Sequence, residues 1–261
     1  MTLFKHELRS GRITLIIWTA VVAFMLGVCV MIYPEMKGQM GEISGMFSEM
    51  GSFSSAFGMD KINFGEFVGF FGVECGNVLG LGGAFFAALL GISALAKEEK
   101  EQTAEFLLTH PISRRKTVAQ KLLAVLVQII IFNAVVIAVS VASIFAVGEE
   151  PDFQKLFLMF LAYFLLQIET ASICFGISAF ISRGGIGFGL GLAALFYFLN
   201  IISNLTESAK FLKYITPFGY TDGAEIITNA SLNIQYICVG FALTVIGIAA
   251  AFLKYEKKDI K

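Results

Sequence analysis

The sequence predicts an all-α integral membrane protein with six transmembrane helices. Of its 261 residues, 57% are hydrophobic and only 15% are charged, whereas soluble domains carry about 25% charged residues. A spanning helix needs about 20 consecutive apolar residues, because hydrocarbon offers the backbone no hydrogen-bond partner. Six stretches meet this requirement, and we expect them to form one transmembrane domain over residues 1–261: 13–33, 74–96, 118–146, 156–181, 185–203 and 233–253.

The first span follows three basic residues, Lys5, Arg9 and Arg12. This arrangement resembles a signal peptide, but the apolar stretch 13–33 is longer than a signal core and no small-residue cleavage site follows it. We therefore expect it to remain as a helix.

The second and fifth spans are rich in glycine at spacings that let helix backbones approach closely. The glycines are Gly72, Gly76, Gly80 and Gly83 in the second, and Gly185, Gly187, Gly189 and Gly191 in the fifth. Packing within one subunit is the favoured interpretation, and contact between two subunits is the alternative.

The third span follows the basic run Arg114–Lys116, and the sixth span precedes Lys254, Lys257, Lys258 and Lys261. With the N-terminus inside, most of the 19 Lys and Arg residues fall on inner segments; the outer ones are Lys37, Lys61, Lys155, Lys210 and Lys213. The positive-inside rule then predicts that both termini are cytoplasmic.

The fourth span is interrupted only by Glu169. An acid within a span is costly, so it marks a candidate functional site. Asn133, at comparable depth in the third span, is the expected partner, whereas Gln167 is expected to point elsewhere. Glu169 could contact a substrate or a proton, or it could form a hydrogen bond that joins two helices.

Several classes of site are excluded by the sequence. The four cysteines form no C-x-x-C pair and there are only two histidines, His6 and His110, so we expect no metal site and no disulfide framework. No phosphate-binding loop and no nucleophile motif occur, so we expect no catalytic residues, no cofactor bound by this chain and no nucleic-acid partner.

The most charged stretch is KEEKEQTAEFLLTHPISRRKTVAQK at 97–121. Residues 97–110 are good helix formers, Pro111 should end this helix, and Ser113 can cap the next one. The result is a small helix–turn–helix element between the second and third spans.

This stretch resembles the same loop in ABC transporter type 2 permeases. Its matching residues are Glu98, Glu99, Thr103, Glu105, Leu107, Leu108, Pro111, Ile112, Ser113, Arg114, Lys121 and Leu122. The segment LFKHELRSGR at 3–12 is similar to the family's interfacial helix ahead of the first span, and FLKYITPFGYTDGAEII at 211–227 is similar to the outer loop before its last span.

The resemblance implies a membrane subunit of an ATP-driven exporter, located in a prokaryotic cell membrane and paired with a second permease subunit. It also implies a cytoplasmic coupling helix that docks on a separate ATPase subunit, which would use ATP and Mg. The coupling residues would be Glu98, Glu99, Thr103, Glu105, Phe106, Leu107, Leu108, His110, Pro111, Arg114 and Arg115. An ion-gradient-driven transporter that uses Glu169 and a non-transporting membrane scaffold are the alternatives.

Overall fold

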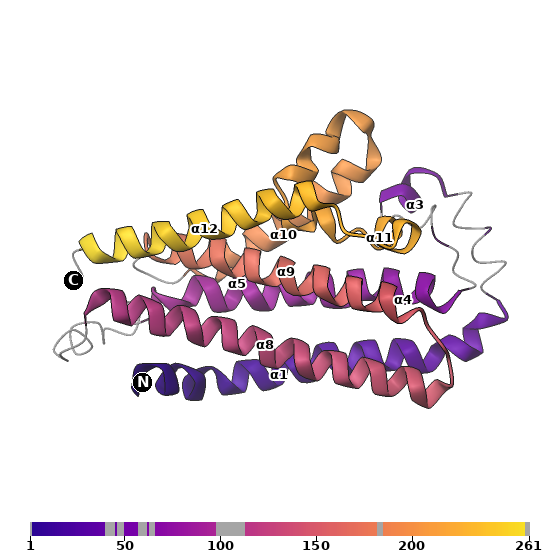
Figure 1. The fold of residues 1–261 in the computed structure, drawn as a ribbon, viewed down its shortest axis with the longest axis horizontal. Helices are drawn as coiled ribbons and strands as arrows, with labels where there is room; N and C mark the ends of the chain where they lie inside the picture. The colour runs from indigo at the N-terminus through magenta and orange to yellow at the C-terminus, as the bar shows by residue number, and fades with distance from the viewer. Residues whose placement is uncertain are drawn as a thin grey trace.

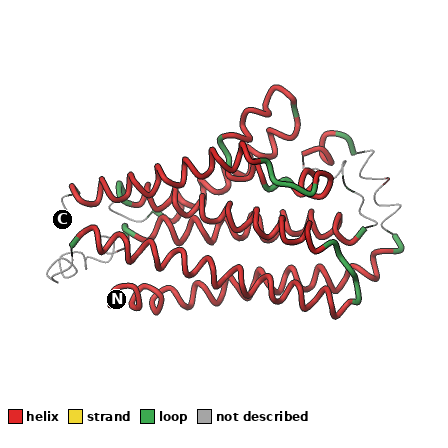
Figure 2. The backbone as a smooth tube through the Cα atoms, in the orientation of Figure 1, coloured by secondary structure: helices red, strands yellow, loops and turns green. Residues whose placement is uncertain are grey.

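The computed structural model describes residues 2–39, 45, 50–56, 62, 66–97, 113–181 and 185–258. These residues form helices and loops and no strand (Figure 2). Six of the helical stretches are long and apolar enough to cross a membrane. They run side by side, and both chain termini lie at the same end of the bundle (Figure 1). We call this end the terminal end and the opposite one the far end.

Each predicted span coincides with one of these six stretches. The helices are α1 (Thr2–Lys37), α4 (Phe67–Cys75) continued by η2 (Gly76–Leu81) and α5 (Gly82–Ala94), α8 (Arg114–Val147), α9 (Phe153–Ser178), α10 (Ile186–Leu205) and α12 (Ile234–Lys257). The six-span prediction is therefore confirmed for the described residues, with helix ends that differ from the predicted ones by up to 11 residues.

The largest difference lies at the start of the chain. Residues 3–12, expected as a separate interfacial helix, are the first turns of α1 and continue without a break into the first span. The predicted coupling residues 98–112 lie outside the described residues.

The second span changes its winding in the middle, where the π-helix η2 separates α4 from α5. Gly76 and Gly80 lie in η2 against the Tyr163 side chain of α9: a Cβ at Gly76 would lie 3.1 Å from its hydroxyl oxygen, and a Cβ at Gly80 would lie 3.0 Å from its ring. The absent side chains let an aromatic ring pack against the backbone, which supports the expected role of these glycines within the subunit.

Helix α9 is largely buried and packs closely against α5 and α12. At Gly91 of α5, a Cβ would overlap the Ala171 carbonyl oxygen of α9. At the crossing with α12, a Cβ on Gly176 would lie 2.6 Å from the Gly247 carbonyl oxygen. By contrast, Gly187 has nothing within 4 Å, so the fifth-span glycines divide between packed and open positions.

Large apolar side chains cover the outside of the bundle. Phe24, Phe157 and Phe241 are 71%, 65% and 69% exposed. In a soluble protein such faces would have to be covered, whereas hydrocarbon accommodates them without cost.

The segment between α10 and α12 folds at the far end as η3 (Glu207–Tyr214), η4 (Pro217–Tyr220) and α11 (Gly223–Asn229). The short helix α3 (Ser52–Ala56) lies at the same end (Figure 1). Asp222 caps α11 by accepting hydrogen bonds from the backbone N–H groups of Ala224 and Glu225. The segment between α10 and α12 contacts α9, where the Tyr163 hydroxyl donates a hydrogen bond to the Thr221 carbonyl oxygen at 3.2 Å.

Candidate functional site

Polar contacts at the terminal end surround the two ends of the 98–112 segment. Lys97 precedes the segment and Ser113 follows it. As predicted, Ser113 caps α8: its Oγ accepts a hydrogen bond from the Lys116 backbone N–H at 3.4 Å. The position of this cap places the start of α8 beside the end of α12.

Arg114 binds the last turn of α12. Its guanidinium donates to the carbonyl oxygens of Glu256 at 3.0 Å and Lys258 at 2.6 Å, and more weakly to that of Tyr255 at 3.4 Å. The final carbonyl groups of a helix lack hydrogen-bond partners, and the helix C-terminus carries partial negative charge. An arginine at this end supplies hydrogen-bond donors to the carbonyls and a positive charge opposite the negative one.

Arg115 pairs with the Glu256 carboxylate on the outside of the same junction. The family resemblance implies that Arg114 and Arg115 contact the ATPase subunit, but in the structure both guanidinium groups bind within the chain. Arg115 remains 77% exposed along its side chain, whereas Arg114 is half-buried. Arg114 therefore tethers the start of α8 to the end of α12.

Lys121 forms the second junction, between α1, α5 and α8. Its side chain is 1% exposed, and its Nζ donates to Glu7 Oε1 at 2.9 Å and to the Ala94 carbonyl oxygen at 2.7 Å. One helical turn after Glu7, Ser10 accepts a hydrogen bond from Lys97. A buried ion pair that also has backbone partners holds three helix ends in one arrangement.

A third junction joins α12 to the loop after α9, where Lys258 Nζ donates to the Ile181 carbonyl oxygen at 3.1 Å. We call these three junctions together the collar. Its members are Glu7, Ser10, Ala94, Lys97, Arg114, Arg115, Lys121, Ile181, Glu256 and Lys258. Sequence reasoning identified Arg114, Arg115 and Lys121 only as motif positions and missed their partners.

Midway along the bundle, Asn133 is buried and donates to Gln167 Oε1 at 2.6 Å and to the Ile129 carbonyl oxygen at 2.9 Å. The expected pairing of Asn133 with Glu169 is therefore wrong. Residues 167 and 169 differ by about 200° around a helix, because each residue turns it by about 100°. Only one of them can face α8, and it is Gln167.

Glu169 is 3% exposed and faces the opposite side of α9. Its Oε2 accepts a hydrogen bond from the Tyr220 hydroxyl at 2.8 Å. The carboxylate lies against Gly240 of α12, where a Cβ would overlap it. Glu169 thus joins α9, η4 and α12, an arrangement in which the acid ties the far-end segment to the bundle.

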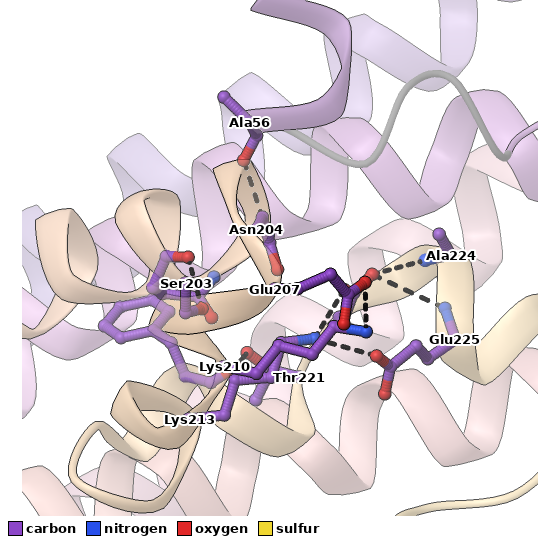
Figure 3. A network of polar contacts seen from close by, with 12 residues as sticks. Ala56, Ser203, Asn204, Glu207, Lys210, Lys213, Thr221, Ala224 and Glu225 are labelled. Carbon is purple, nitrogen blue, oxygen red and sulfur yellow. Dashed lines mark hydrogen bonds and ion pairs between the residues drawn. The ribbon is translucent and has the colours of Figure 1, made fainter. Parts of the chain in front are cut away.

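The far-end segment is also held by a buried lysine. Lys213 Nζ lies 3.3 Å from Asp222 Oδ2 and 2.7 Å from Glu225 Oε1. Figure 3 shows the Lys213 side chain pointing toward Glu225, with the η3 backbone on one side and α11 on the other. Burial lowers the pKa of Lys213, but Asp222 and Glu225 raise it by more, so the pKa lies above its usual value.

The fold and these contacts define a multi-pass membrane protein whose helices are joined by polar junctions at both ends. Residues 1–260 match the family model described as ABC-2 family transporter protein. The chain therefore belongs to this family of ABC transporter permeases. A comparison with curated proteins finds no match.

Proposed function

We propose that the chain is the membrane-spanning subunit of an ATP-driven ABC exporter. The observation that carries this proposal is the family match over residues 1–260. A permease without a phosphate-binding loop needs another subunit to hydrolyse ATP, so a partner would bind ATP and Mg and supply the driving force.

The proposed contact with the ATPase subunit is the 98–112 segment, with Phe106 and Leu107 as apolar anchors and the acids around them as orienting groups. The collar supports this role, because both ends of the segment adjoin fixed contacts. A displacement of the segment would act on α5 through Lys97 and on α8 and α12 through Arg114. A partner shifts such an equilibrium only by binding one conformation more tightly than the other.

The proposed assembly contains two permease subunits, identical or related, and two ATPase subunits. The proposed location is a prokaryotic cell membrane with the terminal end in the cytoplasm. The charge distribution supports this orientation, because the collar end carries most of the Lys and Arg residues.

Charge reversal and anchor removal in the segment test the docking. We expect Phe106→Ala and Glu105→Lys to reduce the ATPase subunit that co-purifies and to uncouple transport, while membrane insertion is unchanged. Glu150→Lys is the matched control, because the same charge reversal then falls on an exposed residue at the far end. Equal recovery of the ATPase subunit with all three variants would contradict the proposal.

The same experiment addresses the two alternatives. A gradient-driven transporter or a membrane scaffold would be purified from native membranes without any subunit that carries a phosphate-binding loop. Transport in vesicles that persists without ATP would favour the gradient-driven alternative.

A further inference from the structure

A cavity of about 270 Å³ lies beside the collar, between α1, α5 and α8 and the first residues of α10. Its volume is close to the lower end of the range of small-molecule sites, roughly 300–1,000 Å³. Most of its wall is apolar and is formed by Leu89, Leu90, Val125 and Ile186. A few polar groups converge on it, which is the composition typical of a ligand site.

One buried polar atom in the cavity wall has no partner. Gln128 is 4% exposed; its Nε2 donates to the Ala124 carbonyl oxygen at 3.2 Å, but its Oε1 has no hydrogen bond in the part of the chain that the structure describes. The oxygen lies against Gly11 of α1, where any side chain would occupy the same space: a Cβ at Gly11 would overlap Gln128 Oε1. Buried acceptors normally have a donor, so this oxygen points to a ligand that supplies an O–H or N–H group.

The other end of the cavity carries charged side chains. Glu7 and Lys121 line it and form an ion pair. Lys97 also lines it, and its ammonium contacts the neutral Ser10 hydroxyl, with no carboxylate partner among the described residues. Among the residues that the structure describes, Lys97 is therefore a cation without an acidic partner, and such a cation favours an anionic group.

The distance between the two polar ends suits a short amphiphile. Lys121 and Gln128 are seven residues apart on α8, which corresponds to two turns of one helix face, about 10 Å. Apolar side chains line the cavity between them.

We propose that this cavity binds a small amphiphilic acid that carries a hydroxyl or amine donor at its other end. The anionic group lies at Lys97 and the donor reaches Gln128 Oε1. This site lies within one subunit and does not depend on the ATPase partner, so the permease alone should bind the ligand.

The test compares two probes on the purified full-length permease in lipid nanodiscs: ω-hydroxydecanoic acid and decanoic acid, which lacks the hydroxyl. We expect the hydroxy acid to bind about tenfold more tightly, because its hydroxyl pairs with a buried acceptor. In Gln128→Leu this preference should disappear while binding of decanoic acid is retained. In Lys97→Gln both acids should bind more weakly.

Ser93→Leu provides an independent check, because Ser93 lines the cavity and the larger side chain would fill it. We expect binding of both acids to be lost. Each variant is first shown to elute as a folded protein by size exclusion, and the Gln128→Leu comparison remains decisive if Ser93→Leu is not folded. Equal affinity of the native protein for the two acids, or a preference unchanged in Gln128→Leu, would overturn the proposal.

Discussion

The tether between Arg114 and the end of α12 makes a prediction that can be measured locally. Arg114→Gln removes a charged donor from two well-formed carbonyl contacts, at 2.6 and 3.0 Å, and one weak contact at 3.4 Å. Hydrogen bonds from charged groups contribute about 1.5–3 kcal/mol when the partner stays buried. The carbonyls of a helix end can be rehydrated, so we take about 1 kcal/mol for each good contact and about 2 kcal/mol in total.

Amide hydrogen exchange of the last turn of α12 is the appropriate assay, because it reports opening of that turn rather than of the whole protein. A loss of about 2 kcal/mol corresponds to roughly 30-fold faster exchange. Arg115→Gln is the matched control: it removes the neighbouring guanidinium, whose ion pair with Glu256 is solvent-exposed and so contributes little.

We therefore expect strong acceleration over residues 252–257 in Arg114→Gln and little in Arg115→Gln, with exchange at the start of α12 unchanged in both. Equal acceleration in the two variants would show that the junction depends on net charge and not on the carbonyl contacts of Arg114.

Three further predictions concern the bundle and its far end. Lys213→Met leaves Asp222 without its cation and should cost somewhat less than the roughly 3–5 kcal/mol of a fully buried pair, since Glu225 is 39% exposed. Because the pKa of Lys213 is raised above 10.5, the stability difference from the native protein should be constant in thermal unfolding at neutral pH and should shrink only as the pH rises through that pKa. Gly176→Ala places a methyl group 2.6 Å from a backbone oxygen and should destabilise by about 1–3 kcal/mol, whereas Gly187→Ala, which meets nothing within 4 Å, should be neutral; comparable melting temperatures would argue against the close α9–α12 crossing. Glu169→Gln keeps an acceptor for Tyr220 and should preserve assembly and transport, so lost transport with intact assembly would assign Glu169 to a substrate or proton path.

The helices could be predicted because the membrane imposes one requirement on every span. In hydrocarbon the backbone N–H and C=O groups must form hydrogen bonds with one another, so a long apolar run folds as a helix whatever surrounds it. The helix ends were less predictable. In α1 the helix begins in the polar residues before 13 and continues past Pro34 to Lys37, although Gly11 and Pro34 are both poor helix formers.

The side-chain pairings depend on how each helix is rotated about its axis and on which helices are neighbours. A single sequence does not reveal the rotation or the neighbours of a helix. Asn133 and Gln167 are 34 positions apart and lie on different helices. The choice between Gln167 and Glu169 depended on the rotation of α9 about its axis. The contact between Lys121 and Glu7 spans 114 positions. A lysine within the first turns of an apolar helix was the only signal that could have indicated a buried partner.

The glycine pattern had intermediate predictive value. Small residues at four-residue spacing predict that some helix approaches closely, and Gly76 and Gly80 confirm it. The sequence could not identify Tyr163 as the group that fills the space, nor the π-helical turn in which these glycines lie.

The proposed function requires that the segment between the second and third spans receives force from an ATPase subunit. A photoreactive amino acid at position 106, illuminated in native membranes, measures this directly through mass spectrometry of the cross-linked product; position 150 at the far end is the control. We predict a cross-link from position 106, and not from position 150, to a protein with a phosphate-binding loop. Cross-links from position 106 only to lipid, or labelling of that position by an impermeant reagent added outside intact cells, would contradict the account.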